Sequence, residues 1–393
     1  MIARARLQKS LIEGLARHPA VALLGPRQCG KTTLARQVSR AAGATFFDLE
    51  NPDDVAALEN PMLALEGLSG LVVLDEVQRR PELFPVLRVL MDRDEAPAKF
   101  LLLGSASPFL VRGVTESLAG RVAFIDLQGF LLDEVGAADL SRLWARGGFP
   151  RSFLAEDENS SHGWRRDFIR TFIEKDFSTL GLGTTPSSLG RLWQMAAHYH
   201  GQTLNASEIG RALGESYKTV QRHLELLEGA FMIRLLRPWF ENLGKRLVKS
   251  PKLYVRDSGL FHSLLGIGSY ASLLGNPKIG ASWEGFALEQ ILARLPKMDA
   301  WFWGTQGGAE LDLLIQPNGK RIGFEFKVAD APRMTKSLSI AQNDLGLDEL
   351  LVVKPRGDGY PMEEKIRAAP LVEALEYCDA ISSGGAWMFH TAG

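Results

Sequence analysis

Residues near the N-terminus match the pattern of a phosphate-binding loop. Positions 25–32 read Gly-Pro-Arg-Gln-Cys-Gly-Lys-Thr, which fits G-x-x-x-x-G-K-[ST] at every fixed position. In such a loop successive backbone N–H groups point at phosphate oxygens, and the following helix presents its positive N-terminus to the same anion. The pattern predicts a nucleoside triphosphate site, with Lys31 at the β- and γ-phosphates and the Thr32 hydroxyl on Mg²⁺. The residues expected to contact the nucleotide are Gly25, Pro26, Arg27, Gln28, Cys29, Gly30, Lys31, Thr32 and Thr33.

A strand that ends in two carboxylates lies about 40 residues beyond the loop. Positions 71–76 read Leu-Val-Val-Leu-Asp-Glu, so an apolar strand delivers Asp75 and Glu76 to its carboxyl end. We expect Asp75 to hold Mg²⁺, often through water, and Glu76 to orient or deprotonate the attacking water. The alternative is a solvated strand end with no role in chemistry.

Two further residues are candidates for nucleotide chemistry. Ser105 follows Leu-Leu-Leu-Gly and would end the neighbouring strand, where a polar side chain can sense the γ-phosphate. Arg121, at the end of Ser-Leu-Ala-Gly-Arg, is a candidate for stabilising charge in the transition state, including across a subunit interface. The alternatives are an ordinary turn serine and a structural ion pair.

A second constellation of charged residues lies in the last third of the chain. Asp312 sits in a strand-like segment, and Glu325-Phe-Lys327 follows thirteen residues later in another. Positions i and i+2 of a strand share a face, so Glu325 and Lys327 point the same way and a paired strand can bring Asp312 beside them. Carboxylates hold a divalent metal, which activates water at a phosphodiester, and Glu284 on the preceding helix could complete the site. The alternative is a structural salt-bridge cluster in a domain that only binds.

The elements that must position these residues fall into three patterns. Over the first 130 or so residues, strands alternate with helices, which predicts a parallel sheet covered on both faces. Residues 203–228 have the spacing of a helix-turn-helix, and strand-like segments at 231–236 and 252–255 would form its wing. The last third reads as a separate α/β unit, with a helix at 283–295 followed by several strands.

Charge and composition restrict the classes of function. The net charge is −1 over 393 residues, which argues against a surface that is basic throughout. The segment 211–256 nevertheless carries ten Lys and Arg against four Asp and Glu, so a local patch for DNA is open. Two cysteines, no zinc spacing, no signal peptide and no run of 18 apolar residues predict a cytoplasmic protein without a membrane partner.

Several runs resemble a prokaryotic family of AAA-type ATPases with a C-terminal domain of unknown function. They are residues 25–34, Phe-Asp-Leu-Glu at 47–50, Leu-Asp-Glu-Val-Gln-Arg-Arg-Pro at 74–81, Gly-Ser-Ala-Ser at 104–107, and residues 117–121. The resemblance covers essentially the whole chain and implies an α/β fold: a P-loop NTPase core, a winged-helix middle and a restriction-endonuclease-like C-terminal domain. Cys29 stands where a small aliphatic residue is expected. The implied division is 1–135 ATPase, 136–200 helical lid or connector, 201–275 winged helix-turn-helix and 276–393 nuclease-like.

These observations predict an ATP- and Mg²⁺-dependent ATPase whose nucleotide state controls the winged-helix and nuclease-like module, acting on DNA. Two alternatives stay open at this point. One is a nucleotide-gated, Mg²⁺-dependent DNA nuclease, and the other is a slow switch that binds nucleotide and presents the winged helix to a protein partner or an operator. A homo-oligomer is also open, since Arg121 could act on the nucleotide of a neighbouring subunit.

Overall fold

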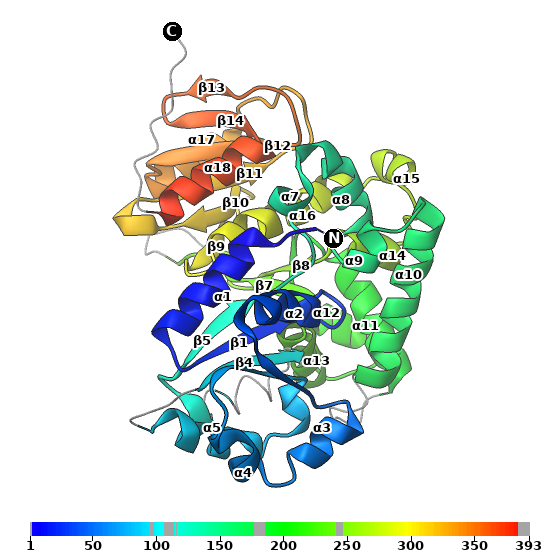
Figure 1. The fold of residues 1–393 in the computed structure, drawn as a ribbon. Helices are drawn as coiled ribbons and strands as arrows, with labels where there is room; N and C mark the ends of the chain where they lie inside the picture. Colours follow the sequence, from blue (N-terminus) through cyan, green and yellow to red (C-terminus); the bar gives the residue numbers. More distant parts are fainter. Residues whose placement is uncertain are drawn as a thin grey trace. The chain divides into compact units, whose positions relative to one another are not determined.

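The computed structural model describes residues 2–93, 98–105, 114, 116–176, 185–240 and 247–383 (Figure 1). The chain forms two compact units. The first contains residues 1–130 together with 225–232, and the second contains residues 131–224 and 233–393. Within the described ranges, no helix is long and apolar enough to cross a membrane.

The first unit is built on a five-stranded sheet in the order β2-β3-β4-β1-β5, with every neighbouring pair parallel. Its strands are β1 (Ala20–Gly25), β2 (Thr45–Asp48), β3 (Gly70–Asp75), β4 (Ala98–Ser105) and β5 (Val122–Asp126). Strands and helices alternate along this unit as the sequence predicts, and all strand pairs are parallel, which confirms the parallel α/β core. The helices are α1 (Ala5–Arg17), α2 (Lys31–Ala42), α3 (Pro52–Ala57), α4 (Pro61–Glu66) and α5 (Leu83–Met91).

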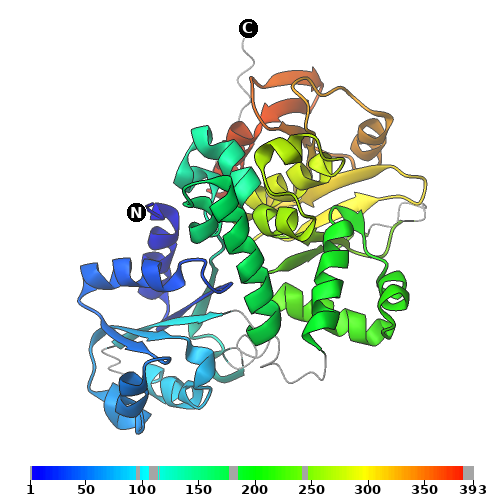
Figure 2. The same cartoon turned by 90° about the vertical axis from the view of Figure 1, so that its right-hand side faces the viewer.

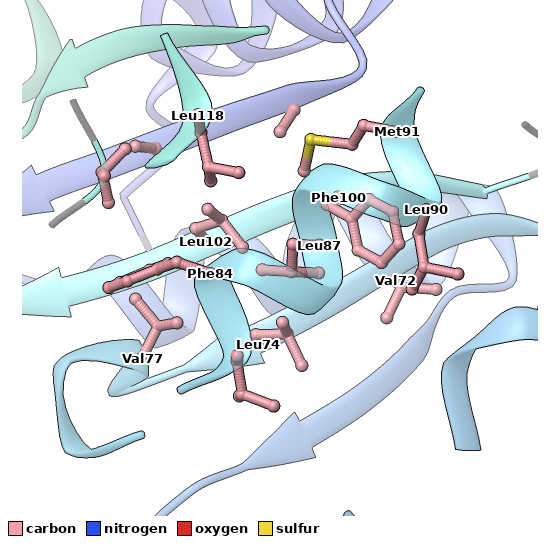
Figure 3. Close-up of a cluster of buried hydrophobic side chains, with 14 of the residues drawn as sticks. Val72, Leu74, Val77, Phe84, Leu87, Leu90, Met91, Phe100, Leu102 and Leu118 are labelled. Carbon is pink, nitrogen blue, oxygen red and sulfur yellow. The ribbon is translucent and has the colours of Figure 1, made fainter. Parts of the chain in front are cut away.

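The apolar runs of the central strands are explained by burial on both faces of this sheet. Alternate residues such as Val72 and Leu102 face α5, where they pack with Leu87 in one buried cluster (Figure 3). The residues between them face the other way, and Val21 lies so close to α1 that a Cβ on Gly14 would come within 2.9 Å of it. The central strands β1, β3 and β4 are therefore buried at nearly every position, whereas the outer strands β2 and β5 are only partly buried.

A short segment from far along the chain completes the first unit. Helix α13 (Tyr217–Gly229) ends inside the segment 225–232, and Phe231 packs against the same buried cluster as α5. Phe231 has φ +62°, a conformation that a bulky residue adopts only when its surroundings require it. The first unit is thus discontinuous in sequence.

The second unit begins with helices and contains the predicted helix-turn-helix segment up to residue 224. Helix α12 (Ala206–Leu213) ends at Gly214, which has φ +72°, and α13 follows after a short turn. A small antiparallel sheet in the order β6-β8-β7 accompanies them, made of β6 (Gln202–Thr203), β8 (Lys252–Val255) and β7 (Ile233–Leu236). The elements lie at the predicted positions, and their assignment as a winged helix stays a prediction.

A six-stranded mixed sheet forms the rest of the second unit, in the order β13-β14-β12-β11-β10-β9 (Figure 2, yellow to red). The strands are β9 (Ala300–Gly304), β10 (Glu310–Ile315), β11 (Ile322–Phe326), β12 (Glu349–Lys354), β13 (Tyr360–Glu363) and β14 (Ile366–Pro370). Helices α16 (Ile279–Arg294), α17 (Lys336–Leu345) and α18 (Leu371–Ser382) cover it. The α/β character predicted for the last third is confirmed, whereas the endonuclease-like assignment and the four domain boundaries stay predictions.

Two of the buried histidines of the second unit, His200 and His262, are each paired at both ring nitrogens. His200 Nδ1 accepts from the Val255 N–H at 2.9 Å, and its Nε2 lies 3.1 Å from the Ala281 carbonyl. His262 Nδ1 lies 2.9 Å from the Ala145 carbonyl, and its Nε2 lies 2.7 Å from Ser282 Oγ. Burial lowers the pKa of each imidazole to about 3, so both rings are neutral in the folded protein.

We expect the second unit to lose stability as the pH falls below about 6.5, the usual pKa of an unfolded-chain histidine. Below that pH each of these histidines is protonated in the unfolded chain but stays neutral in the folded protein. The free energy of unfolding therefore falls by up to about 1.4 kcal/mol per pH unit for each histidine. All eight tryptophans lie beyond residue 143, so tryptophan fluorescence during urea unfolding reports on this unit. A His262→Gln variant should show a pH slope shallower by up to about 1.4 kcal/mol per unit. Equal slopes in the two proteins would contradict the neutral assignment of His262.

Candidate nucleotide and cation sites

The phosphate loop lies between the carboxyl end of β1 and the first residue of α2. Gly25 ends the strand and Lys31 begins the helix, as the motif requires. A Cβ on Gly25 would lie 1.9 Å from the Leu127 carbonyl oxygen, so only glycine fits there. Gln28 and Gly30 have positive φ values of 61° and 101°, which turn the loop back toward the helix. Cys29 is fully buried, and burial raises the pKa of its thiol, so it fills space beneath the loop.

A buried arginine that the sequence analysis missed holds the loop in place. The guanidinium of Arg4 donates to the Cys29 carbonyl at 3.2 Å, and to the carbonyls of Gln128 and Gly129 at 3.0 and 2.8 Å. Arg4 is only 4% exposed, so these bonds are made away from water, where each is worth more than at the surface. Nothing in its sequence neighbourhood signals this role, since its partners are 25 to 125 residues away.

The two predicted magnesium ligands lie side by side. The Thr32 hydroxyl donates to Asp75 Oδ2 at 2.7 Å, and Asp75 Oδ1 accepts from the Glu76 N–H at 3.0 Å. Burial and the nearby carboxylates Glu76 and Asp48 raise the pKa of Asp75, although the Thr32 hydrogen bond opposes them. A cation would remove this like-charge penalty, so the donor set of one hydroxyl and one carboxylate fits Mg²⁺.

Lys31 folds back over its own loop. Its Nζ donates to the carbonyl oxygens of Gly25 and Pro26 at 3.0 and 2.8 Å, and the side chain is buried. The ammonium is therefore already at the mouth of the phosphate-binding backbone, paired with neutral acceptors that phosphate oxygens can replace.

Glu76 and Ser105 are brought together by a third residue, Gln78. The Gln78 Nε2 group donates to a carboxylate oxygen of Glu76 and to Ser105 Oγ, the latter at 3.0 Å. Glu76 adopts φ +57°, and the short η1 helix (Val77–Arg79) that follows turns Gln78 back toward it. The Gln78 Oε1 atom is buried with no hydrogen-bond partner in the described ranges. The sequence showed Gln78 only as part of Asp-Glu-Val-Gln, without assigning it a contact.

Arg121 lies where the strands of the sheet begin, whereas the loop lies where they end. Its backbone carbonyl accepts from the N–H of Ala20, the first residue of β1, whereas the loop follows the last residue of that strand. Its side chain forms a two-point ion pair with Asp92, with one N···O distance of 2.8 Å. The structure thus does not place Arg121 beside the nucleotide site of its own chain. Ser107, part of the run that carries the family resemblance, lies outside the described residues.

The C-terminal carboxylates form a tight cluster in the second unit. Register pairs Leu313 with Phe324, which sets Asp312 opposite Glu325, and Asp312 Oδ2 accepts from the Phe326 N–H at 3.0 Å. Lys327 Nζ pairs with Glu325 Oε1 at 2.7 Å. One oxygen each from Glu284, Glu310 and Asp312 lies within 4.8 Å of the others, close enough to share a cation. The four predicted residues are therefore brought together, and Glu310 joins them.

A buried lysine from another sheet lies inside this cluster. Lys252, the first residue of β8, contacts Glu284 Oε1 at 3.1 Å, Asp312 Oδ1 at 3.0 Å and the Glu310 carboxylate. The Tyr254 hydroxyl donates to Glu284 Oε1 at 2.6 Å. The sequence analysis treated 252–255 only as a wing strand. All four residues of β8 are buried, and a lysine in such a strand needs a charged partner inside the protein. Lys252 in this otherwise uncharged strand was therefore the signal for an internal ion pair.

Burial dominates the titration of the cluster. Burial and the charge of Asp312 raise the pKa of Glu284 to about 7 and that of Glu325 to about 8. Burial also acts to raise the pKa of Asp312, but Lys252 and Lys327 outweigh it and the pKa is lowered. For Lys252, burial favours the neutral form, yet Tyr254 and the surrounding carboxylates hold its pKa well above the usual value.

Comparison with known proteins matches three successive parts of the chain to family models. A family model described as "AAA domain" matches residues 17–136, and two models described as domains of unknown function (DUF8612 and DUF4143) match residues 137–271 and 279–374. Uncharacterized protein Rv2008c of Mycobacterium tuberculosis and Uncharacterized protein Mb2031c of Mycobacterium bovis are each 48% identical to the chain. Each alignment spans 95% of this chain and 84% of the relative. The chain belongs to the family of these two proteins. It carries an AAA-type P-loop ATPase domain and a C-terminal domain of unknown function, which confirms that part of the resemblance.

Two solved structures align with part of the chain. The Walker-type ATPase PABY2304 of Pyrococcus abyssi is 17% identical, with a TM-score of 0.49 over 67% of this chain and 96% of that one. The RuvB Holliday junction branch migration motor of Thermotoga maritima is 18% identical, with a TM-score of 0.31 over 60% of this chain and 90% of that one. At these scores the fold assignment depends on the parallel sheet and the family match.

We expect Gln78→Ala to lower kcat for ATP hydrolysis by about 100-fold, because the Glu76 carboxylate loses the donor that orients it. ATP binding should be unchanged, since no loop residue is altered. A coupled phosphate-release assay over a range of ATP concentrations separates kcat from KM. Gln8→Ala is the matched control, since Gln8 also uses its amide in a part-buried bond, to Gln37. A Gln78→Ala protein as fast as wild type would show that Gln78 does not position Glu76.

Proposed function

We propose that the first unit binds ATP with Mg²⁺ and hydrolyses it. The observation that carries the proposal is the convergence of Lys31, Thr32, Asp75 and Glu76 at one edge of the parallel sheet, with the Thr32 hydroxyl 2.7 Å from Asp75. The family match to an AAA domain over the same residues supports it.

Each residue at this edge has a part in the proposed reaction. The loop N–H groups and the α2 N-terminus bind the phosphates, and Lys31 exchanges its two carbonyl partners for β- and γ-phosphate oxygens. Thr32 and Asp75 would hold Mg²⁺, which neutralises the phosphate charge. Glu76 acts as the base that orients or deprotonates the attacking water. The Gln78 amide links Glu76 to Ser105, the residue that would sense the γ-phosphate.

We expect Lys31→Ala to weaken ATP binding by about 2–5 kcal/mol, a factor of about 30 or more in Kd, because phosphate charge is left without its cation. Glu76→Gln should bind ATP as the wild type does and fail to turn it over. Equilibrium binding of a fluorescent ATP analogue, with a phosphate-release assay on the same samples, distinguishes the two effects. Unchanged hydrolysis by the Lys31→Ala protein would rule out this site.

We further propose that the nucleotide state controls DNA binding by the second unit. Helix α13 carries Lys218 and Arg222 one turn apart, and both are exposed, whereas His223 is buried. Exposed cations at i and i+4 share a helix face, which suits two neighbouring phosphates.

Two alternatives differ in what hydrolysis accomplishes. A nucleotide-gated nuclease would use Asp312, Glu325 and Lys327, and it is favoured by the carboxylate cluster and opposed by the lysine inside it. A slow switch would only present the helix-turn-helix segment to a partner. Arg121 enters either scheme only in an oligomer, since it lies far from the loop of its own chain.

We expect Lys218→Ala/Arg222→Ala to weaken DNA binding and to flatten its dependence on salt. Each lost phosphate contact should reduce the slope of log K against log salt by about 0.9, so the pair should reduce it by about 1.8. Fluorescence anisotropy with a labelled duplex at several salt concentrations measures the slope in ADP and in an ATP analogue. Lys9→Ala/Arg17→Ala removes two exposed cations from α1 and should leave the slope unchanged. Equal slopes in all three proteins would exclude α13 from DNA contact.

A further inference from the structure

The ammonium of Lys252 is buried and paired with three acidic groups. The Lys252 side chain is 1% exposed, and its three carboxylate partners come from α16 and β10. A lysine ammonium has three N–H donors, and the cluster offers it one oxygen each from Glu284, Glu310 and Asp312. Every donor is therefore matched to a carboxylate, with the Phe302 ring 5.7 Å from the nitrogen as a further wall. A buried cation so completely paired is a structural counter-ion.

The same three carboxylates could hold a divalent cation. One oxygen of each lies within 4.8 Å of those of the other two, and all three carboxylates contact Lys252 Nζ. Hard divalent cations take carboxylate oxygens at about 2.0–2.6 Å, so such an ion would lie where the ammonium now lies. The ammonium and the metal would compete for one position, and both could not be bound at once.

A second observation indicates that the cluster can hold more than the ammonium. The Oε2 atom of Glu325 is buried and accepts no hydrogen bond from the described part of the chain, while Oε1 pairs with Lys327. Glu325 lies opposite Asp312 across the β10–β11 ladder. A buried carboxylate oxygen without a partner is costly, and a cation held by Asp312 would supply one.

We propose that Lys252 is an internal cation that closes a divalent-cation site formed by Glu284, Glu310 and Asp312. The lysine takes the place of the metal, and a metal binds only when the ammonium has left. This inference is independent of the proposed ATPase. It qualifies the nuclease alternative, because a nuclease centre of these residues is inactive while Lys252 lies inside it.

Replacement of the lysine by a neutral side chain of similar length tests the proposal. Lys252→Met should bind one Mn²⁺ at least about tenfold more tightly than the wild type. Binding is measured on the full chain by the loss of the free Mn²⁺ electron paramagnetic resonance signal, without nucleotide or DNA. Lys252→Met/Asp312→Asn should lose the added Mn²⁺ site, and Lys320→Met, at an exposed lysine, should bind as the wild type does.

Three results would overturn the proposal. The first is a Lys252→Met protein that folds, as judged by circular dichroism, and binds no more Mn²⁺ than the wild type. The wild type could equally bind Mn²⁺ as tightly as Lys252→Met, with Asp312→Asn abolishing it, which would mean that no ammonium has to leave. If Lys252→Met is unfolded without metal, restoration of its thermal unfolding transition by Mn²⁺ supports the proposal, and failure at saturating Mn²⁺ refutes it. Since no ATP is present, none of these results depends on the ATPase assignment.

Discussion

Parallel pairing of three neighbouring strands is the constraint on which the nucleotide site depends. Strands β3, β4 and β1 run in the same direction, so their carboxyl ends meet at one edge of the sheet. Register pairs Gly25 with Ser105, and one strand further along lies Asp75. The loop, the proposed metal ligand Asp75 and Ser105 are thus positioned by backbone hydrogen bonds between strands, and their side chains need only short reaches. The Arg4 guanidinium then holds the loop at the end of β1 through its hydrogen bond to the Cys29 carbonyl.

The second unit depends on a different principle, the pairing of buried charge. Glu289 is fully buried between Arg234 and Arg256, and these two cations lower its pKa to about 2 despite the effect of burial. Lys252 reverses the arrangement, with one cation among several carboxylates. Removing one member of such a group leaves the others uncompensated in a low dielectric, which costs far more than an exposed ion pair is worth. The strands and helices that supply these charges are thereby held in one register.

The sequence was sufficient wherever a motif is local. The loop, the strand that carries Asp75 and the five strands of the first sheet follow from short patterns, because a strand and a phosphate loop are each defined over a few residues. The direction of those strands also bears on Arg121. Arg121 directly precedes β5, which is parallel to β1, so it lies where the strands begin and the loop lies where they end. This follows from the topology of the sheet and cannot be read from the spacing of residues in the sequence.

The residues whose roles could not be predicted from the sequence contact partners that are far away along the chain. Arg4 reaches carbonyls more than 100 residues away, and Lys252 meets Asp312 60 residues on. Such contacts are set by how elements pack, and packing leaves no periodic trace in the chain. Gln78 is an intermediate case, since its partner Glu76 is adjacent but Ser105 comes from the next strand of the sheet.

Because residues 225–232 belong to the first unit, the first 130 residues do not contain the whole of that unit. This limits where the gene can be truncated or recombined without damage to the fold. Phe231 packs against the core of the ATPase fold although it lies slightly more than 100 residues after residue 130, where the rest of the unit ends. A gene fragment ending after the fifth strand would leave that part of the core open to water. Recombination that exchanged only the N-terminal portion would pair a new core with a foreign Phe231. The ATPase and the region that follows it are therefore expected to pass between genomes as one piece.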